Sequence, residues 1–347
     1  MRITLPPCEQ SQIRPSALLY PFFVRRSAEF ANCSSDCDFG PVWAAMQESS
    51  LNFRDKAMLN PSDSAVRTVI FATDLSEKTT RPLNCAVEIA SSLSAKLLLV
   101  HVLTPHEANL MEHASSEIRE QAEFARKELG RISQSILAAK QIPSEILVRH
   151  GEIRDVIFEI RRQYSADFVI VGSSGEKAGR GRALGSTAEA IFRTLPCSVV
   201  AIGPNVRSSN CGRKIESVLL PIDFGSSTSM AALPEGVALS QRLCADLLLL
   251  HVSRTPSLMS KSCDCQYQMD KAVQSARAKW PQVQGLLLDG PVPLTIASCA
   301  KERGIGLIVM SVRPGDLEDG TRLHGVISDV IREAPCPVLS LVPNIVH

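Results

Sequence analysis

Apolar residues fall into short continuous runs along this chain, separated by longer stretches in which apolar and polar residues follow a helical period. The runs Val69–Ala72, Leu97–Val102, Phe168–Val171 and Val199–Ile202 have the length of strands. Continuous rather than alternating apolar strands are typical of parallel sheets that are buried on both faces. We therefore predict a parallel sheet that is covered by helices on both sides.

The stretches between these runs predict helices. Thr79–Leu93 is amphipathic and carries Pro82 in its first turn, where proline is tolerated. Ser115–Ala139 has apolar residues at spacings of three and four, which suits a long surface helix. Two shorter helices are expected at Ile153–Arg162 and Thr187–Arg193. Strictly alternating strands and helices predict a doubly wound α/β fold with right-handed crossovers.

The same order of segments occurs twice. VRTVIFATDLS from Val66 matches ESVLLPIDFGS from Glu216, and TLPCSVVAIGP from Thr194 matches EAPCPVLSLVP from Glu333, with two further matched pairs between them. We therefore predict two tandem domains of five strands each, at residues 66–204 and 215–347, joined by a polar linker at 205–214. The long helix of the second domain is expected to be short, at about Gln268–Lys279.

Residues 1–65 do not fit the repeat and are rich in Pro, Ser and Cys. We expect a disordered extension, or a start codon placed too early with Met46 or Met58 as the true start. A docking arm for a partner is the functional alternative. The apolar stretch Ala17–Val24 contains Pro21 and lacks a clear cleavage site, so we expect no signal peptide and a cytoplasmic protein.

Composition narrows the classes of partner. The chain has 347 residues, 45% of them hydrophobic and 21% charged, with a formal net charge of +1. Such a balance supports real cores and argues against a protein that coats nucleic acid. The longest apolar runs have strand length, far below the ~20 residues that a membrane-spanning helix needs. We expect neither a nucleic-acid partner nor a membrane partner.

The chain contains eleven cysteines, and their placement matters more than their number. Five lie within apolar patterns and are expected to be buried thiols that act as small hydrophobic residues: Cys85, Cys197, Cys244, Cys299 and Cys336. The two close pairs, Cys33 with Cys37 and Cys263 with Cys265, lack the C-x-x-C spacing of zinc or redox sites. No metal site is expected.

A glycine-rich stretch, IVGSSGEKAGRGRALGST at residues 170–187, is the strongest candidate for chemistry. An apolar strand breaks there into a loop that ends at the start of a helix. Glycines let the backbone approach a ligand closely, and a helix N-terminus presents free N–H groups and a positive dipole. Together they favour an anion, most often phosphate. The spacing fits neither a Walker A loop nor the dinucleotide fingerprint, and an ordinary mobile loop is the alternative.

These features resemble the universal stress protein (UspA) family, arranged in tandem. The resemblance is carried by Asp74 in FATDLS, by His101-Val102, by the spacing Gly172-x2-Gly175-x9-Gly185-Ser186 and by Pro196-Cys197-Ser198. It covers both repeats and implies a Rossmann-like sheet of order 3-2-1-4-5.

The resemblance implies an ATP site in the first domain, in which Asp74 and Val102 contact adenosine, the loop holds the phosphates, and Mg²⁺ is carried in by them. For Asp74, a helix cap or turn former is the alternative role. The implied binding residues are Ala72, Asp74, Val102, Val171, Gly172, Gly175, Gly185, Ser186 and Thr187.

The second copy keeps Asp223 and His251 but has lost the glycine cradle. Met310 stands where Gly172 stands in the first copy, and Pro314 has no N–H to offer. Three acidic residues in that loop would repel a polyanion: Asp316, Glu318 and Asp319. We expect a degenerate second domain that is kept for pairing or regulation.

The leading hypothesis is an ATP-binding stress regulator. No general base is evident, so an enzyme is not expected, although a slow ATPase or a self-phosphorylating protein remains the alternative, with a nucleotide-independent scaffold as the third reading. The two domains are expected to pair through their apolar fifth strands, Ser198–Ile202 and Val338–Val342, since an open apolar edge invites pairing. A homodimer is a further option.

Overall fold

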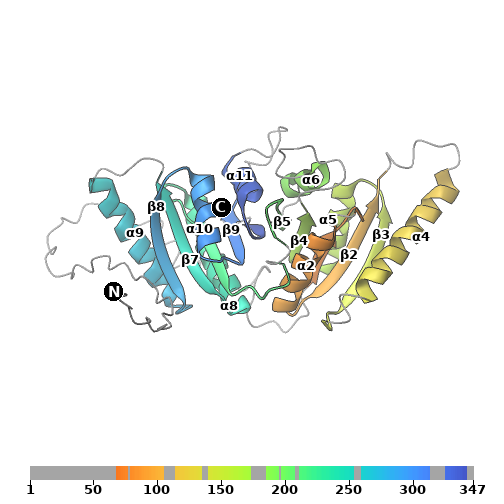
Figure 1. Ribbon diagram of the computed structural model, residues 1–347, viewed down its shortest axis with the longest axis horizontal. Coiled ribbons are helices and arrows are strands. Elements are labelled where there is room, and N and C mark those ends of the chain that lie inside the picture. The colour runs from red at the N-terminus through yellow and green to blue at the C-terminus, as the bar shows by residue number, and fades with distance from the viewer. Residues whose placement is uncertain are drawn as a thin grey trace, which may run out of the picture. The chain divides into compact units, whose positions relative to one another are not determined.

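In the computed structural model, strands and helices alternate along the chain in two successive series, and the strands of both series form one ten-stranded sheet (Figure 1). The structure describes residues 68–76, 79–104, 114–134, 140–172, 185–194, 197–207, 211–253, 259–312 and 325–341. The expected N-terminal extension of residues 1–65, including Met46 and Met58, lies outside the described residues.

The first half of the sheet is formed by β1 to β5, and four helices accompany it in the part of the chain that the structure describes. Its strands are β1 (Thr68–Ala72), β2 (Lys96–Leu103), β3 (Ser144–His150), β4 (Phe168–Gly172) and β5 (Ser198–Ile202). Its helices are α2 (Thr80–Ser92), α4 (Ala114–Ile132), α5 (Ile153–Tyr164) and α6 (Ser186–Thr194).

The second half repeats this order, and its described residues include one additional short helix. Its strands are β6 (Ser217–Pro221), β7 (Asp246–Ser253), β8 (Val283–Asp289), β9 (Leu307–Ser311) and β10 (Val338–Leu341). Its helices are α7 (Ser227–Ala231), α8 (Leu233–Leu243), α9 (Met259–Arg277), α10 (Val292–Glu302) and α11 (Val326–Glu333).

The strand order confirms the predicted fold class. The full order is β3-β2-β1-β4-β5-β10-β9-β6-β7-β8, so each half has the order 3-2-1-4-5. All pairs within a half are parallel. Each half is therefore a doubly wound α/β unit, and the order of strands reverses direction between β1 and β4 and between β6 and β9.

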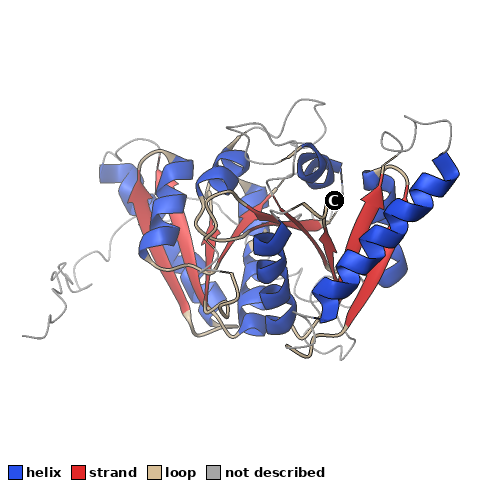
Figure 2. Cartoon of the chain, turned by 45° about the vertical axis from the view of Figure 1, so that its right-hand side comes forward, coloured by secondary structure: helices blue, strands red, loops and turns tan. Residues whose placement is uncertain are grey.

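Helices cover both faces of the sheet, which explains why its central strands are apolar (Figure 2). Ile70, Leu98, Val169 and Val199 are completely buried. Because both faces of each central strand are dry, neither face can carry the polar residues that an exposed sheet shows. The apolar runs in the sequence therefore correspond to the observed strands.

Helix α9 is longer than the sequence predicted. We expected a helix at about Gln268–Lys279, but α9 spans Met259–Arg277 and has 19 residues, as many as α4. Its first half reads MSKSCDCQY, which has few apolar residues and no clear period. α9 packs against β8, so tertiary contacts support a helix whose own sequence has a weak helical period.

The two halves meet where β5 and β10 pair in antiparallel orientation. Val200 lies opposite Leu339, and these two residues occupy matching positions in the two repeats, so a local pseudo-twofold axis passes between them. The hydroxyl of Ser340, which is buried, accepts a hydrogen bond from the Val199 N–H and donates one to the Val199 carbonyl, each at 3.1 Å. This buried serine adds side-chain hydrogen bonds to the strand ladder.

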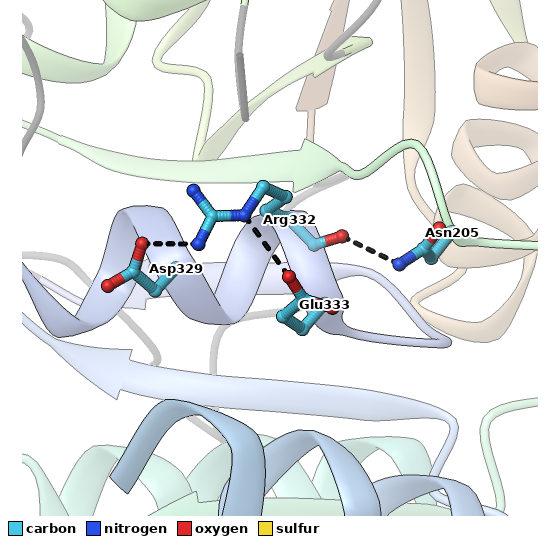
Figure 3. A network of polar contacts seen from close by, with 4 residues as sticks. All are labelled: Asn205, Asp329, Arg332 and Glu333. Carbon is cyan, nitrogen blue, oxygen red and sulfur yellow. Dashed lines mark hydrogen bonds and ion pairs between the residues drawn. The ribbon is translucent and has the colours of Figure 1, made fainter. Parts of the chain in front are cut away.

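The segment after β5 is fastened to both halves. Arg81 of α2 donates from Nη1 to the Pro204 carbonyl at 3.0 Å, and Cys85 of α2 forms a disulfide with Cys211. On the other side, Asn205 donates from Nδ2 to the Arg332 carbonyl in α11 at 2.9 Å (Figure 3). These contacts tie Pro204 and Cys211 to α2, and Asn205 to α11.

Two of the expected buried thiols differ from the prediction. Cys85 is buried but is bonded to Cys211 rather than free. Cys244 is exposed because it follows the end of α8 in a left-handed conformation, which turns the chain toward β7. Cys197, Cys299 and Cys336 are free and buried, as expected.

Candidate functional site

Three neighbouring strands of the first half end close together at one edge of the sheet. Ala72 ends β1 and pairs in register with Val171 of β4 on one side and with Val100 of β2 on the other. Val102 lies two residues after Val100 in β2. Because β1 and β4 flank the point where the strand order reverses, this carboxyl edge is the usual ligand site of an open α/β sheet.

Asp74 lies in the turn that follows β1, and its side chain is exposed. Its Oδ1 accepts a hydrogen bond from the Ser76 N–H at 3.1 Å and one from the Thr79 hydroxyl at 3.4 Å. Thr73 stabilises the same turn, since its hydroxyl accepts the Leu75 N–H at 3.0 Å. Asp74 therefore shapes the turn before α2, as the alternative role predicted, while its carboxylate stays open to solvent.

His101 joins this turn to the end of β2. Its Nδ1–H donates to the Thr73 carbonyl at 2.9 Å, immediately before Asp74. This bond fixes the tautomer and leaves Nε2 as the acceptor of the neutral ring. His101 contributes to the family resemblance, and His251 occurs at the matching place in the second repeat, but the sequence alone does not predict this hydrogen bond.

Gly172, at the end of β4, allows a close approach to α2. A Cβ at this position would lie 2.8 Å from Pro82 Cγ. The missing side chain lets the first turn of α2 pack against the end of β4, beside the turn that holds Asp74. Gly172 therefore has a packing role in addition to the phosphate role that the resemblance implies.

The structure places the remaining predicted residues as follows. Gly185 is buried, and its carbonyl accepts the Glu189 N–H at 2.8 Å as α6 begins. The backbones of Ser186 and Thr187 form the first turn of α6. Gly175 and the rest of the loop at 173–184 lie outside the described residues. At the described positions, five predicted residues are brought to one edge: Ala72, Asp74, Val102, Val171 and Gly172.

The second half builds the same turn from different side chains. Asp223 accepts the Gly225 N–H at 3.0 Å through Oδ1, and the Asp223 N–H donates to the Ser229 hydroxyl at 2.7 Å. His251 donates from Nδ1 to the Ile222 carbonyl at 2.9 Å, as His101 does to Thr73. The Phe224 ring lies 4.6 Å from the His251 ring. The acidic loop with Pro314 lies outside the described residues.

The described residues contain no group of three or more His, Cys, Asp or Glu side chains that could hold a metal ion. None of the described helices combines the length and the apolar character that crossing a bilayer requires.

These features define a tandem doubly wound α/β protein with a candidate ligand edge in its first half. The model of the universal stress protein family matches residues 65–203 and 214–341, most of the chain. The chain therefore belongs to the universal stress protein family.

Relatives found by sequence and by structure agree with this family. The Universal stress protein A homolog 1 of Coxiella burnetii is 28% identical over 147 residues, which cover 39% of this chain and 94% of that protein. Among solved structures, a universal stress protein from Archaeoglobus fulgidus has a TM-score of 0.64 at 21% identity and covers 80% of this chain and 98% of its own. A functionally unknown protein from Pseudomonas aeruginosa PAO1 has a TM-score of 0.53 at 15% identity, over 81% of this chain and 94% of its own. At such identities the structures support the fold.

Proposed function

We propose that the first domain binds ATP at the carboxyl edge of β1, β2 and β4. The observation that carries this proposal is the convergence of Ala72, Asp74, Val102 and Gly172 beside the reversal of strand order. The exposed carboxylate of Asp74 is available to adenosine. The phosphates would extend toward Gly175 and the N-terminus of α6, at Gly185, Ser186 and Thr187, and would carry Mg²⁺.

We further propose how the chain is divided into domains and what the second domain does. The first domain covers residues 66–204, the linker 205–214 and the second domain 215–347. The second domain carries no phosphate cradle in its sequence and serves as the partner of the first, held through β5 and β10 in solution. ATP would act as a ligand that orders the loop after β4 and so biases contacts with partners, which makes the protein a nucleotide-responsive stress regulator in the cytoplasm.

The chain supplies a matched pair of variants for testing the site. Asp74 and Asp223 follow equivalent strands and shape equivalent turns. Asp74→Ala should weaken ATP binding about tenfold, which is the effect of losing one hydrogen bond to a neutral group. Asp223→Ala should leave ATP affinity unchanged while it perturbs its own turn by a similar amount. Isothermal titration of the full chain with Mg-ATP measures both.

The outcome separates the candidate functions. Equal affinities in both variants and the parent would contradict the assignment of Asp74 to adenosine. Nucleotide that co-purifies with the protein and is released on denaturation adds a second readout: ATP supports a regulator, and ADP supports a slow hydrolase. If no nucleotide co-purifies and titration with ATP gives no heat of binding, the protein would instead be a nucleotide-independent interaction scaffold.

A further inference from the structure

A cavity of about 900 Å³ is lined by the segment after β5 and by residues of the second half. Glu216, which precedes β6, and Gly306, which precedes β9, both line it. The cavity therefore lies at the amino-terminal ends of these strands, whereas the Asp223 turn lies at their carboxyl ends. Its lining includes none of the residues that are predicted to bind ATP.

The cavity carries an excess of positive charge. Arg207, Arg213, Lys214 and Lys301 line it, and all four are exposed. No ion pair joins any of them to a carboxylate among the described residues. Two carboxylates also line the cavity, but Glu333 is bound by Arg332 Nε at 3.1 Å (Figure 3). Arg332 also binds Asp329, so it offsets the charge of Glu333 in part. Among the described lining residues, four cations therefore face the two carboxylates Glu216 and Glu333.

Helices α10 and α11 end at this cavity, which suggests a simpler role for the cations. The last carbonyls of a helix carry partial negative charge, and nearby Lys or Arg residues stabilise them. Here a neutral donor already binds one such carbonyl in α11, since Asn205 Nδ2 donates to the Arg332 carbonyl. Just beyond the end of α10, the Ser217 hydroxyl donates to the Gly304 carbonyl at 3.3 Å. Stabilising the carbonyls at these two helix ends therefore does not account for all four cations that line the cavity.

One face of α10 gives the cavity an apolar wall. Leu294, Ala297 and Lys301 lie at spacings of three and four, so they share one side of the helix. Leu294 is 54% exposed and is among the few large hydrophobic residues that are exposed in the described part of the chain. Exposed leucine beside unpaired guanidinium and ammonium groups fits a ligand that has both an apolar and an anionic part.

We propose that this cavity binds an organic phosphate, with its apolar group against Leu294 and its phosphate on Arg213, Lys214 and Arg207. Guanidinium groups match the geometry of phosphate oxygens, and the volume lies in the range of small-molecule pockets. The Cys85–Cys211 disulfide ties the chain to α2 only two residues before Arg213, which limits how far Arg213 and Lys214 can move before binding. Such preorganisation reduces the entropic cost of binding.

The test uses 1-naphthyl phosphate, which carries a ring and a dianion, and isothermal titration of the full chain. Inorganic phosphate and 1-naphthol supply the two halves of the probe separately, and each should bind more weakly than the whole. The double charge reversal R213E/K214E should weaken binding of the probe by about tenfold or more. Leu294→Ser should weaken binding of the naphthyl compound but leave inorganic phosphate unaffected.

The chain offers a matched control in Arg126 and Lys127, an adjacent exposed pair on α4 in the first half. R126E/K127E changes the net charge by the same amount and should leave the affinity unchanged. Melting temperatures of both double variants show whether each is folded. The proposal is overturned if the probe does not bind, if R126E/K127E weakens it as much as R213E/K214E does, or if Asp74→Ala abolishes its binding.

Discussion

At the scale of single residues, Gly203 sets how closely the two halves approach. It follows β5 directly, and a Cβ built on it would overlap the backbone carbonyl oxygen of Ile331 in α11. Gly203→Ala should therefore push α11 away from the end of β5 and destabilise the protein by about 1–3 kcal/mol, as overpacking does. Urea unfolding monitored by circular dichroism measures the change.

Gly130 provides the control for this substitution. It lies within α4, and nothing comes within 4 Å of a Cβ built on it. Gly130→Ala should stabilise the protein by roughly 0.5–1 kcal/mol, since alanine favours the helix. If both substitutions shifted stability in the same direction, the steric role of Gly203 would be wrong.

The free thiols should differ sharply in reactivity. Burial raises the pKa of the Cys197 thiol to about 11 and that of Cys336 to about 12, so both are protonated at neutral pH. Only the thiolate attacks iodoacetamide. Cys244 is exposed and should be alkylated first at pH 8, while Cys197 and Cys336 stay slow up to about pH 10.

Peptide mass spectrometry over time measures these rates, and the same reaction in urea should bring the three thiols to similar rates. Rapid labelling of Cys336 in the folded protein at pH 8 would contradict the burial that the structure gives it.

At the scale of elements, the pairing of β5 with β10 can be tested by single substitutions. Val200 and Leu339 are 2% and 1% exposed and face each other across the pair. A carboxylate at either position would be buried without a partner, so Val200→Glu or Leu339→Glu should separate the strands and promote aggregation. Hydrogen exchange of the Val199 amide, which Ser340 protects, should accelerate strongly.

The control for this prediction is a charge at the far end of the sheet. Ile146 lies on the terminal strand β3 and is half-buried. Ile146→Glu should leave exchange at Val199 unchanged. Unchanged exchange in the Val200 and Leu339 variants would instead show that the junction does not depend on these contacts.

The elements that the sequence predicted best are those with one dominant physical signal. Strands such as Phe168–Gly172 are buried on both faces, so burial alone determines their composition. The end of β1 followed by Asp74 and the end of β4 at Gly172 were predictable for the same reason, because loops begin where apolar runs stop. Strand order then brings these ends together, and that order came from the family resemblance.

Features that depend on distant contacts were not predictable. Cys85 and Cys211 are 126 residues apart, and nothing in the helical pattern around Cys85 distinguishes a bonded cysteine from a buried thiol. The start of α9 is polar and lacks an apolar period, so the sequence carries no signal for where this helix begins. The hydrogen bond from His101 to Thr73 likewise links two strand ends whose proximity only the sheet defines.

At the scale of the whole molecule, the Cys85–Cys211 disulfide closes a long loop that contains most of the first half. Such a crosslink restricts the unfolded chain and typically contributes about 2–4 kcal/mol. Dithiothreitol should therefore lower the melting temperature of the protein. The double variant Cys85→Ala/Cys211→Ala should melt at the lower temperature with or without reductant, whereas Cys244→Ala should keep the full response.

A melting temperature that reductant does not change would contradict a stabilising disulfide. The same measurement bears on the compartment, since disulfides are rare in the reducing cytosol. Non-reducing mass analysis of protein that is alkylated inside intact cells should show how much of the bonded form exists there.

Because the two halves are joined in one chain, their junction does not depend on the association of two separate molecules. Two separate copies would meet only at sufficient expression, whereas a short tether keeps the local concentration of the partner near the millimolar range at any expression level. In a pair of identical strands, every substitution occurs twice. Here Ser340 matches Ala201 in the repeat, yet only Ser340 carries the hydroxyl that binds Val199. Each side of the junction can therefore diverge without a matching change on the other.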